Sequence, residues 1–147
     1  MNAYEILKGK HQKEVNELPI FFAFSNEQFD EEMKKLGLKP HETDKIYEFK
    51  NIGGFYFKTD AEKIFGIFKQ HEDELRDAIA NDKTGDGFIY DMFYTELWNH
   101  EFTVDYSTES TLDSLDLTDE MVKKDPRLKH GLAKAIAEQK RRNMEGY

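Results

Sequence analysis

The chain has 147 residues, enough for one globular domain over residues 1–147, and a net charge of −9 at pH 7. The absence of cysteine excludes disulfides, thiolate zinc sites and cysteine nucleophiles, and it fits a cytoplasmic protein. The negative charge argues against direct binding of nucleic acid, whose affinity comes mainly from lysine and arginine contacts to phosphate, and no apolar run is long enough to span a membrane.

The first half of the chain alternates helical and strand patterns. Helices are predicted over residues 3–17, 26–36 and 61–81, and short strands over residues 20–24, 45–49 and 54–57. Pro19 opposes continuation of the first helix, Ser25 is a suitable N-cap for the second, and Gly37 suits its C-cap. A hairpin turn is expected at residues 51–54, between the last two strands.

The second half is predicted to be helical. One helix is expected over residues 88–99, Thr118 is a candidate N-cap for a further helix, and another helix runs from the Asp125-Pro126 pair toward Arg142, because proline fits the first turn of a helix. Between residues 102 and 116 the pattern weakens, which predicts a loop with room for one short helix. The chain is therefore expected to be α+β, a mostly helical single domain with a small antiparallel β-sheet.

Residues 82–89 resemble the first eight positions of an EF-hand calcium loop, with Asp82 and Asp86 at the first and fifth positions. Phe93 stands at the twelfth position, where that family uses a bidentate glutamate. We therefore interpret the segment as a polar connection between two helices, in which Gly85 and Gly87 adopt positive φ and Asp86 caps the second helix. Calcium binding by the two aspartates stays open as the alternative.

Glu96 and His100 lie four residues apart on the helix predicted over residues 88–99, so both side chains could reach one zinc ion. The competing interpretation is a surface Glu–His pair that adds a few tenths of a kcal/mol to the helix. A metal-binding protein or metal-dependent hydrolase that uses these two residues, with Asp82 and Asp86, is therefore the second functional hypothesis. The sequence has no phosphate-binding glycine loop, no Gly-x-Ser-x-Gly motif and no His-Glu-x-x-His motif, so we expect a protein that is not an enzyme.

Charge is distributed unevenly. From residue 72 to residue 120 there are fifteen acidic residues and only two basic ones. Within this stretch, seven carboxylates follow one another every few residues with no lysine or arginine between them: Glu101, Asp105, Glu109, Asp113, Asp116, Asp119 and Glu120. A solvated face that only maintains solubility is one interpretation; the other is a surface that imitates a phosphate backbone and binds a positively charged groove.

The last 27 residues have the opposite sign, with eight basic residues against three acidic ones. Positive charge near the end of the final helix is favourable to the helix dipole, so we expect a mainly structural role for it. A contact between this segment and the acidic residues of a second copy, giving a homodimer, stays open.

Three blocks of the sequence, residues 18–29, 82–89 and 96–101, resemble an uncharacterised family of small acidic proteins from prophages and conjugative elements. Small acidic proteins in that setting are similar in role to anti-CRISPR proteins, which block a host nuclease. The resemblance thus implies a phage-type, non-enzymatic inhibitor that acts as a DNA mimic through protein–protein interaction. Its expected partner is a basic nucleic-acid-binding nuclease, such as a Cas-type effector.

Overall fold

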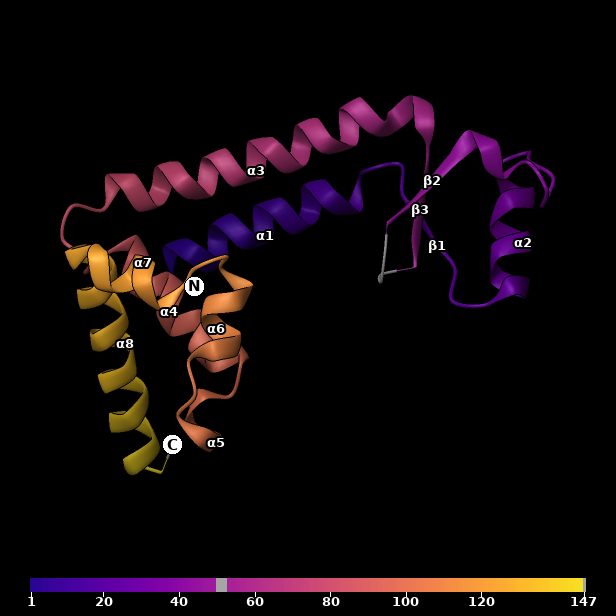
Figure 1. Cartoon of the computed structure of the whole chain (residues 1–147). Helices are drawn as coiled ribbons and strands as arrows, with labels where there is room; N and C mark the ends of the chain where they lie inside the picture. Colours follow the sequence, from indigo (N-terminus) through magenta and orange to yellow (C-terminus); the bar gives the residue numbers. More distant parts are fainter. Residues whose placement is uncertain (50–52, 147) are drawn as a thin grey trace. The chain divides into compact units, whose positions relative to one another are not determined.

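The computed structural model describes residues 1–49 and 53–146, which are mostly helical and include a small three-stranded antiparallel sheet (Figure 1). The α+β class expected from the sequence is confirmed. Two compact units divide the chain: residues 1–11 together with 73–147 form one, and residues 12–72 form the other. The helices α1 (Ala3–Asn16) and α3 (Ala61–Asn81) contribute residues to both units. A single domain over residues 1–147 stays a prediction.

The unit of residues 12–72 contains the sheet. Besides parts of α1 and α3, this unit contains β1 (Phe21–Phe22), α2 (Asn26–Lys35), the 3-10 turn η1 (Thr43–Lys45), β2 (Ile46–Phe49), β3 (Gly54–Phe57) and the 3-10 turn η2 (Lys58–Asp60). The strand order is β1-β3-β2, and both pairings are antiparallel. The strand predicted over residues 20–24 is reduced to two residues, and residues 51 and 52 of the expected hairpin turn lie outside the described residues.

Local sequence signals explain how α2 begins in this unit. The Ser25 hydroxyl accepts a hydrogen bond from the Gln28 backbone N–H (3.1 Å), and the Gln28 side chain accepts one from the Phe24 N–H (2.7 Å). These two bonds satisfy backbone donors that have no partner inside the helix.

The larger unit contains α4 (Phe88–Asn99), α5 (Phe102–Asp105), α6 (Glu109–Ser114), α7 (Asp119–Lys124) and α8 (Pro126–Met144). Four apolar residues of α4 are fully buried, and α8 packs along this helix. These four residues are Ile89, Met92, Phe93 and Leu97. Their helical spacing places them on one stripe, so α4 is the centre of the core of this unit.

The first residues of the chain belong to this unit and pack on α4. Asn2 donates its side-chain N–H to the Thr95 hydroxyl (2.9 Å), and the Ala3 N–H donates to the Asp91 carboxylate (3.2 Å). The buried ring of Tyr4 makes an edge contact with Phe88, with 5.8 Å between the ring centroids. The start of α1 is therefore fixed to residues more than 80 positions later in the chain.

The helices α7 and α8 begin where the sequence predicts. Thr118 accepts a hydrogen bond from the Met121 N–H (3.1 Å), and Asp125 accepts one from the Arg127 N–H (3.0 Å) ahead of the proline that opens α8. The segment of residues 102–116 differs from the prediction, because it contains two short helices instead of a loop with one. Within the described part of the chain, no helix has both the length and the apolar character that crossing a bilayer requires.

Candidate functional site

The seven carboxylates between residues 101 and 120, here called the acidic surface, lie in and around α5, α6 and α7. Three residues of this segment that are not glycine have left-handed backbone conformations: Glu101 (φ 52°), Tyr106 (φ 58°) and Asp116 (φ 54°). Glu101 and Tyr106 flank α5, and Asp116 lies between α6 and α7. Each left-handed residue departs from helical backbone geometry and limits the length of the helix beside it.

One face of these short helices is attached to the core. Phe102, Leu112 and Val122 are buried, and the buried Thr111 donates its hydroxyl to the carbonyl oxygen of Glu96 (3.4 Å). The opposite faces therefore point to solvent, and all seven members of the acidic surface are exposed.

Little of this negative charge is neutralised inside the molecule. Glu120 forms an ion pair with Lys124 (2.8 Å), and it is the one member of the acidic surface with such a pair among the described residues. Two cations near the end of α8, Arg141 and Arg142, pair with Glu138 (2.6 and 3.2 Å), and Lys140 lies over the ring of Tyr106 (5.1 Å to the centroid). The hydrogen bond from Arg141, aided by Arg142, lowers the pKa of Glu138 to about 2.

Three members of the acidic surface surround one hollow of about 560 Å³ between α6 and α7. Glu109, Asp113 and Asp119 contribute to its wall, together with residues that carry hydroxyl groups, among them Ser107 and Thr118. Besides these acceptors and hydroxyls, Leu112 and Leu117 line the hollow, and no lysine or arginine is among its lining residues. It offers a concave acidic surface to a cation.

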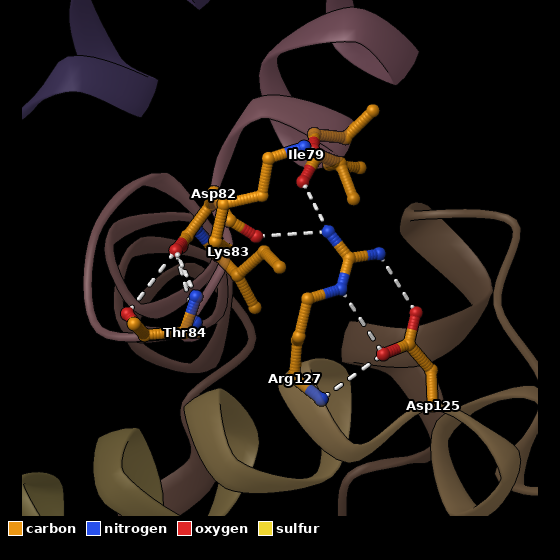
Figure 2. Close-up of polar contacts among 9 residues, drawn as sticks. Ile79, Asp82, Lys83, Thr84, Asp125 and Arg127 are labelled. Carbon is orange, nitrogen blue, oxygen red and sulfur yellow. Dashed lines mark hydrogen bonds and ion pairs between the residues drawn. The ribbon is translucent and has the colours of Figure 1, made fainter.

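The loop that resembles an EF-hand is organised by Asp82 (Figure 2). Its Oδ1 accepts hydrogen bonds from the N–H groups of Thr84 (3.2 Å) and Gly85 (2.9 Å), and its Oδ2 accepts from those of Gly87 (3.1 Å) and Ile89 (3.0 Å). Burial by itself raises the pKa of Asp82, but these four donors outweigh it and hold the pKa below its ordinary value. Both carboxylate oxygens are thus occupied by the backbone.

The expected role of Asp86 as the cap of α4 is wrong. Asp86 instead accepts hydrogen bonds from His130 (2.7 Å) and Lys134 (3.1 Å) of α8, and the cap position belongs to Gly87. Gly85 has positive φ (90°) as predicted, whereas Gly87 has φ −98°. Asp82 takes over the capping role because its carboxylate folds back over the loop and reaches the N–H groups at the start of the helix.

Arg127 holds this loop from the side of α8 (Figure 2). Its guanidinium donates to the carbonyl oxygens of Ile79 (2.9 Å) and Asp82 (2.8 Å) and forms an ion pair with Asp125 (2.9 Å). It therefore satisfies carbonyl groups at the end of α3, which have no partner within that helix. We conclude that the loop is a structural connection between α3, α4 and α8.

The four residues of the metal hypothesis do not form one site. Glu96 lies within 3.9 Å of His100, but its oxygens also accept hydrogen bonds from Asn99 (2.7 Å) and Ser114 (3.1 Å). Asp82 and Asp86 precede the other end of α4, about 15 Å away at the usual rise of a helix. Over residues 1–49 and 53–146, no group of three or more His, Asp or Glu side chains is arranged to hold a metal ion.

A second hollow, of about 440 Å³, was not predicted from the sequence. It lies beside α5 and is lined by Trp98, Glu101, Phe102, Val104 and Gln139, with contributions from Asn99 and Thr103. Trp98 belongs to a row of rings on α4, together with Tyr90 and Tyr94. These three rings recur every four residues in the sequence, and this spacing could have predicted that they lie on one face of the helix.

Residues 3–138 match the protein family described as "Family of unknown function (DUF7659)", and the chain belongs to this family. Comparisons with curated proteins and with solved structures found no match.

Proposed function

We propose that this protein is a non-enzymatic inhibitor that binds a basic, nucleic-acid-binding nuclease through its acidic surface. The observation that carries the proposal is the exposure of seven carboxylates in one segment, six of which form no ion pair with a lysine, arginine or histidine within the described residues. The partner class, a Cas-type effector, comes from the resemblance to small acidic proteins of mobile elements.

Electrostatics supports this choice of partner. Unpaired carboxylates on a protein surface attract a positively charged groove and raise the rate of association. The hollow bounded by Glu109, Asp113 and Asp119 gives part of the surface a concave shape, in which a basic side chain would contact several carboxylates at once. A groove that binds a nucleic-acid backbone has the positive charge that this surface requires.

The test is inhibition of plasmid cleavage by a panel of purified, guide-loaded Cas nucleases. We expect the protein to inhibit at least one of them, with a potency that falls as salt is raised. The variant that tests the surface replaces Asp105, Asp113 and Asp119 with Asn and Glu109 with Gln. Amides preserve the size of each side chain, and the left-handed Asp116 is left unchanged so that no backbone strain is added.

A matched control removes the same number of charges from exposed positions elsewhere, by amide substitution of Asp30, Glu31, Glu62 and Asp77. If each lost interfacial contact is worth about 0.5 kcal/mol, the surface variant should bind about 30-fold more weakly. The control should bind within about threefold of the unmodified protein. Equal affinities of the two variants would remove the acidic surface from the interface, and failure to inhibit any nuclease in the panel would overturn the proposal.

A further inference from the structure

The hollow beside α5 combines apolar walls with acceptor groups. The side chain of Trp98 is 56% exposed and that of Val104 is 79% exposed, whereas Phe102 is buried. Exposed tryptophan beside a concave surface is typical of residues that contribute most to the binding energy of an interface. The hollow lies directly beside the acidic surface, because Glu101 belongs to both.

Gln139 supplies an acceptor from the side of α8. It is only 1% exposed, and its Nε2 donates to the carbonyl oxygen of Tyr94 (3.1 Å). This bond fixes the amide and leaves its Oε1 as the acceptor, which no hydrogen bond uses within the described parts of the chain. Glu101 adds a carboxylate that also has no ion pair there. A ligand of this hollow must therefore donate hydrogen bonds and tolerate apolar walls.

The aromatic row on α4 already binds cations. Lys134 of α8 lies 4.8 Å from the ring centroid of Tyr90, and Arg142 lies 5.5 Å from that of Tyr94. The next ring in the row is Trp98, which faces the hollow. Tryptophan is the side chain that interacts most strongly with a cation above its ring.

We propose that this hollow receives an arginine side chain of the partner protein. The guanidinium plane would stack on the Trp98 indole, and its N–H groups would donate to Gln139 Oε1 and to the Glu101 carboxylate. Lysine fits less well, because its ammonium is a compact charge that does not stack and cannot present two parallel donors. The inference rests on the proposed function, since it names the side chain by which the basic partner would be recognised.

A small probe tests the hollow without the nuclease. Trp98 is the only tryptophan of the chain, so its indole N–H gives a single, assignable NMR signal. We would titrate the ¹⁵N-labelled protein with N-acetyl-arginine methylamide and with the matching lysine compound. We expect the arginine probe to shift the indole signal and the Val104 amide, and to bind about two- to fivefold more tightly than the lysine probe.

Three variants make the test specific. Trp98→Leu keeps an apolar wall without the ring, and Glu101→Gln removes the charge; each should weaken arginine binding about two- to fivefold, read from the Val104 amide. Phe24→Leu removes an exposed ring from the other unit and should change nothing. Equal binding of both probes, an unshifted indole signal, or unchanged binding by Trp98→Leu would overturn the inference. Inhibition of a nuclease would still stand in that case, and arginine binding in this hollow would stand without any nuclease.

Discussion

The substitution Asp82→Asn removes the carboxylate that organises the loop between α3 and α4. In the native protein each carboxylate oxygen accepts two backbone N–H groups. Asparagine can keep one such pair on its carbonyl oxygen, but its NH₂ group then faces the N–H groups of Gly87 and Ile89. Two backbone donors lose their acceptor, one of them at a buried residue, and each loss costs about 1–1.5 kcal/mol. The variant should therefore be less stable by about 2–3 kcal/mol.

Urea unfolding followed by Trp98 fluorescence measures this effect, because the single tryptophan lies on α4 in the same unit as the loop. With a slope of about 2 kcal/mol per M, the midpoint should fall by about 1 M. The matched control is Asp86→Asn, which removes the same charge four residues later, at an exposed carboxylate that accepts hydrogen bonds from the side chains of His130 and Lys134. Its midpoint should move much less. Equal midpoints for the two variants would refute the assignment of Asp82 as the residue that holds the loop.

Three further predictions address packing, pH and metal binding. A Cβ at Gly131 would lie 2.9 Å from a backbone oxygen, so Gly131→Ala should destabilise the protein by about 1–3 kcal/mol. Gly9 has open space around it, so Gly9→Ala should stabilise α1 by up to about 1 kcal/mol. Thermal unfolding should therefore show a lower melting temperature for the first variant and a higher one for the second. Because the folded-state pKa values of Asp82 and Asp125 are lowered, their stabilisation is complete above the unfolded pKa of about 3.9 and is lost as pH falls below it, so acid titration of Asp82→Asn should show a flatter decline than the unmodified protein. Elemental analysis of the purified protein tests the metal hypothesis: we expect no stoichiometric zinc or calcium that disappears on His100→Ala, and finding one would revive that hypothesis.

Elements with local signals were predictable from the sequence. The capping residues Ser25, Thr118 and Asp125 mark starts of helices, and each makes its expected hydrogen bond. The pairing of β1 with β3 was not predicted, because it joins residues more than 30 positions apart and depends on the path of the chain between the two strands. The two short helices α5 and α6 were also missed as a pair. Left-handed residues that are not glycine flank α5 on both sides and follow shortly after α6, and sequence patterns do not mark such residues.

The candidate site was predictable only in part. The density of carboxylates indicated an acidic surface, and the exposure of those residues follows from the buried faces of α5 to α7. The hollow beside Trp98 could not be predicted, because Gln139 reaches it from a helix 40 residues later. The sequence predicted Asp86 as the residue that caps α4, because a capping residue is normally expected close to the first residue of a helix. The structure gives this role to Asp82, which lies six residues before Phe88.

The larger unit is interrupted in the sequence: residues 12–72 separate its first eleven residues from the remainder. On the ribosome, Asn2 and Tyr4 are synthesised long before Thr95 and Phe88, the residues they contact in the finished fold. The beginning of α1 therefore contacts its partners only after more than 80 further residues have been translated, whereas residues 12–72 form one continuous stretch of the sequence. The unit of residues 12–72 can therefore form first during synthesis. The Tyr4 ring lacks its native packing partner Phe88 until α4 has been synthesised.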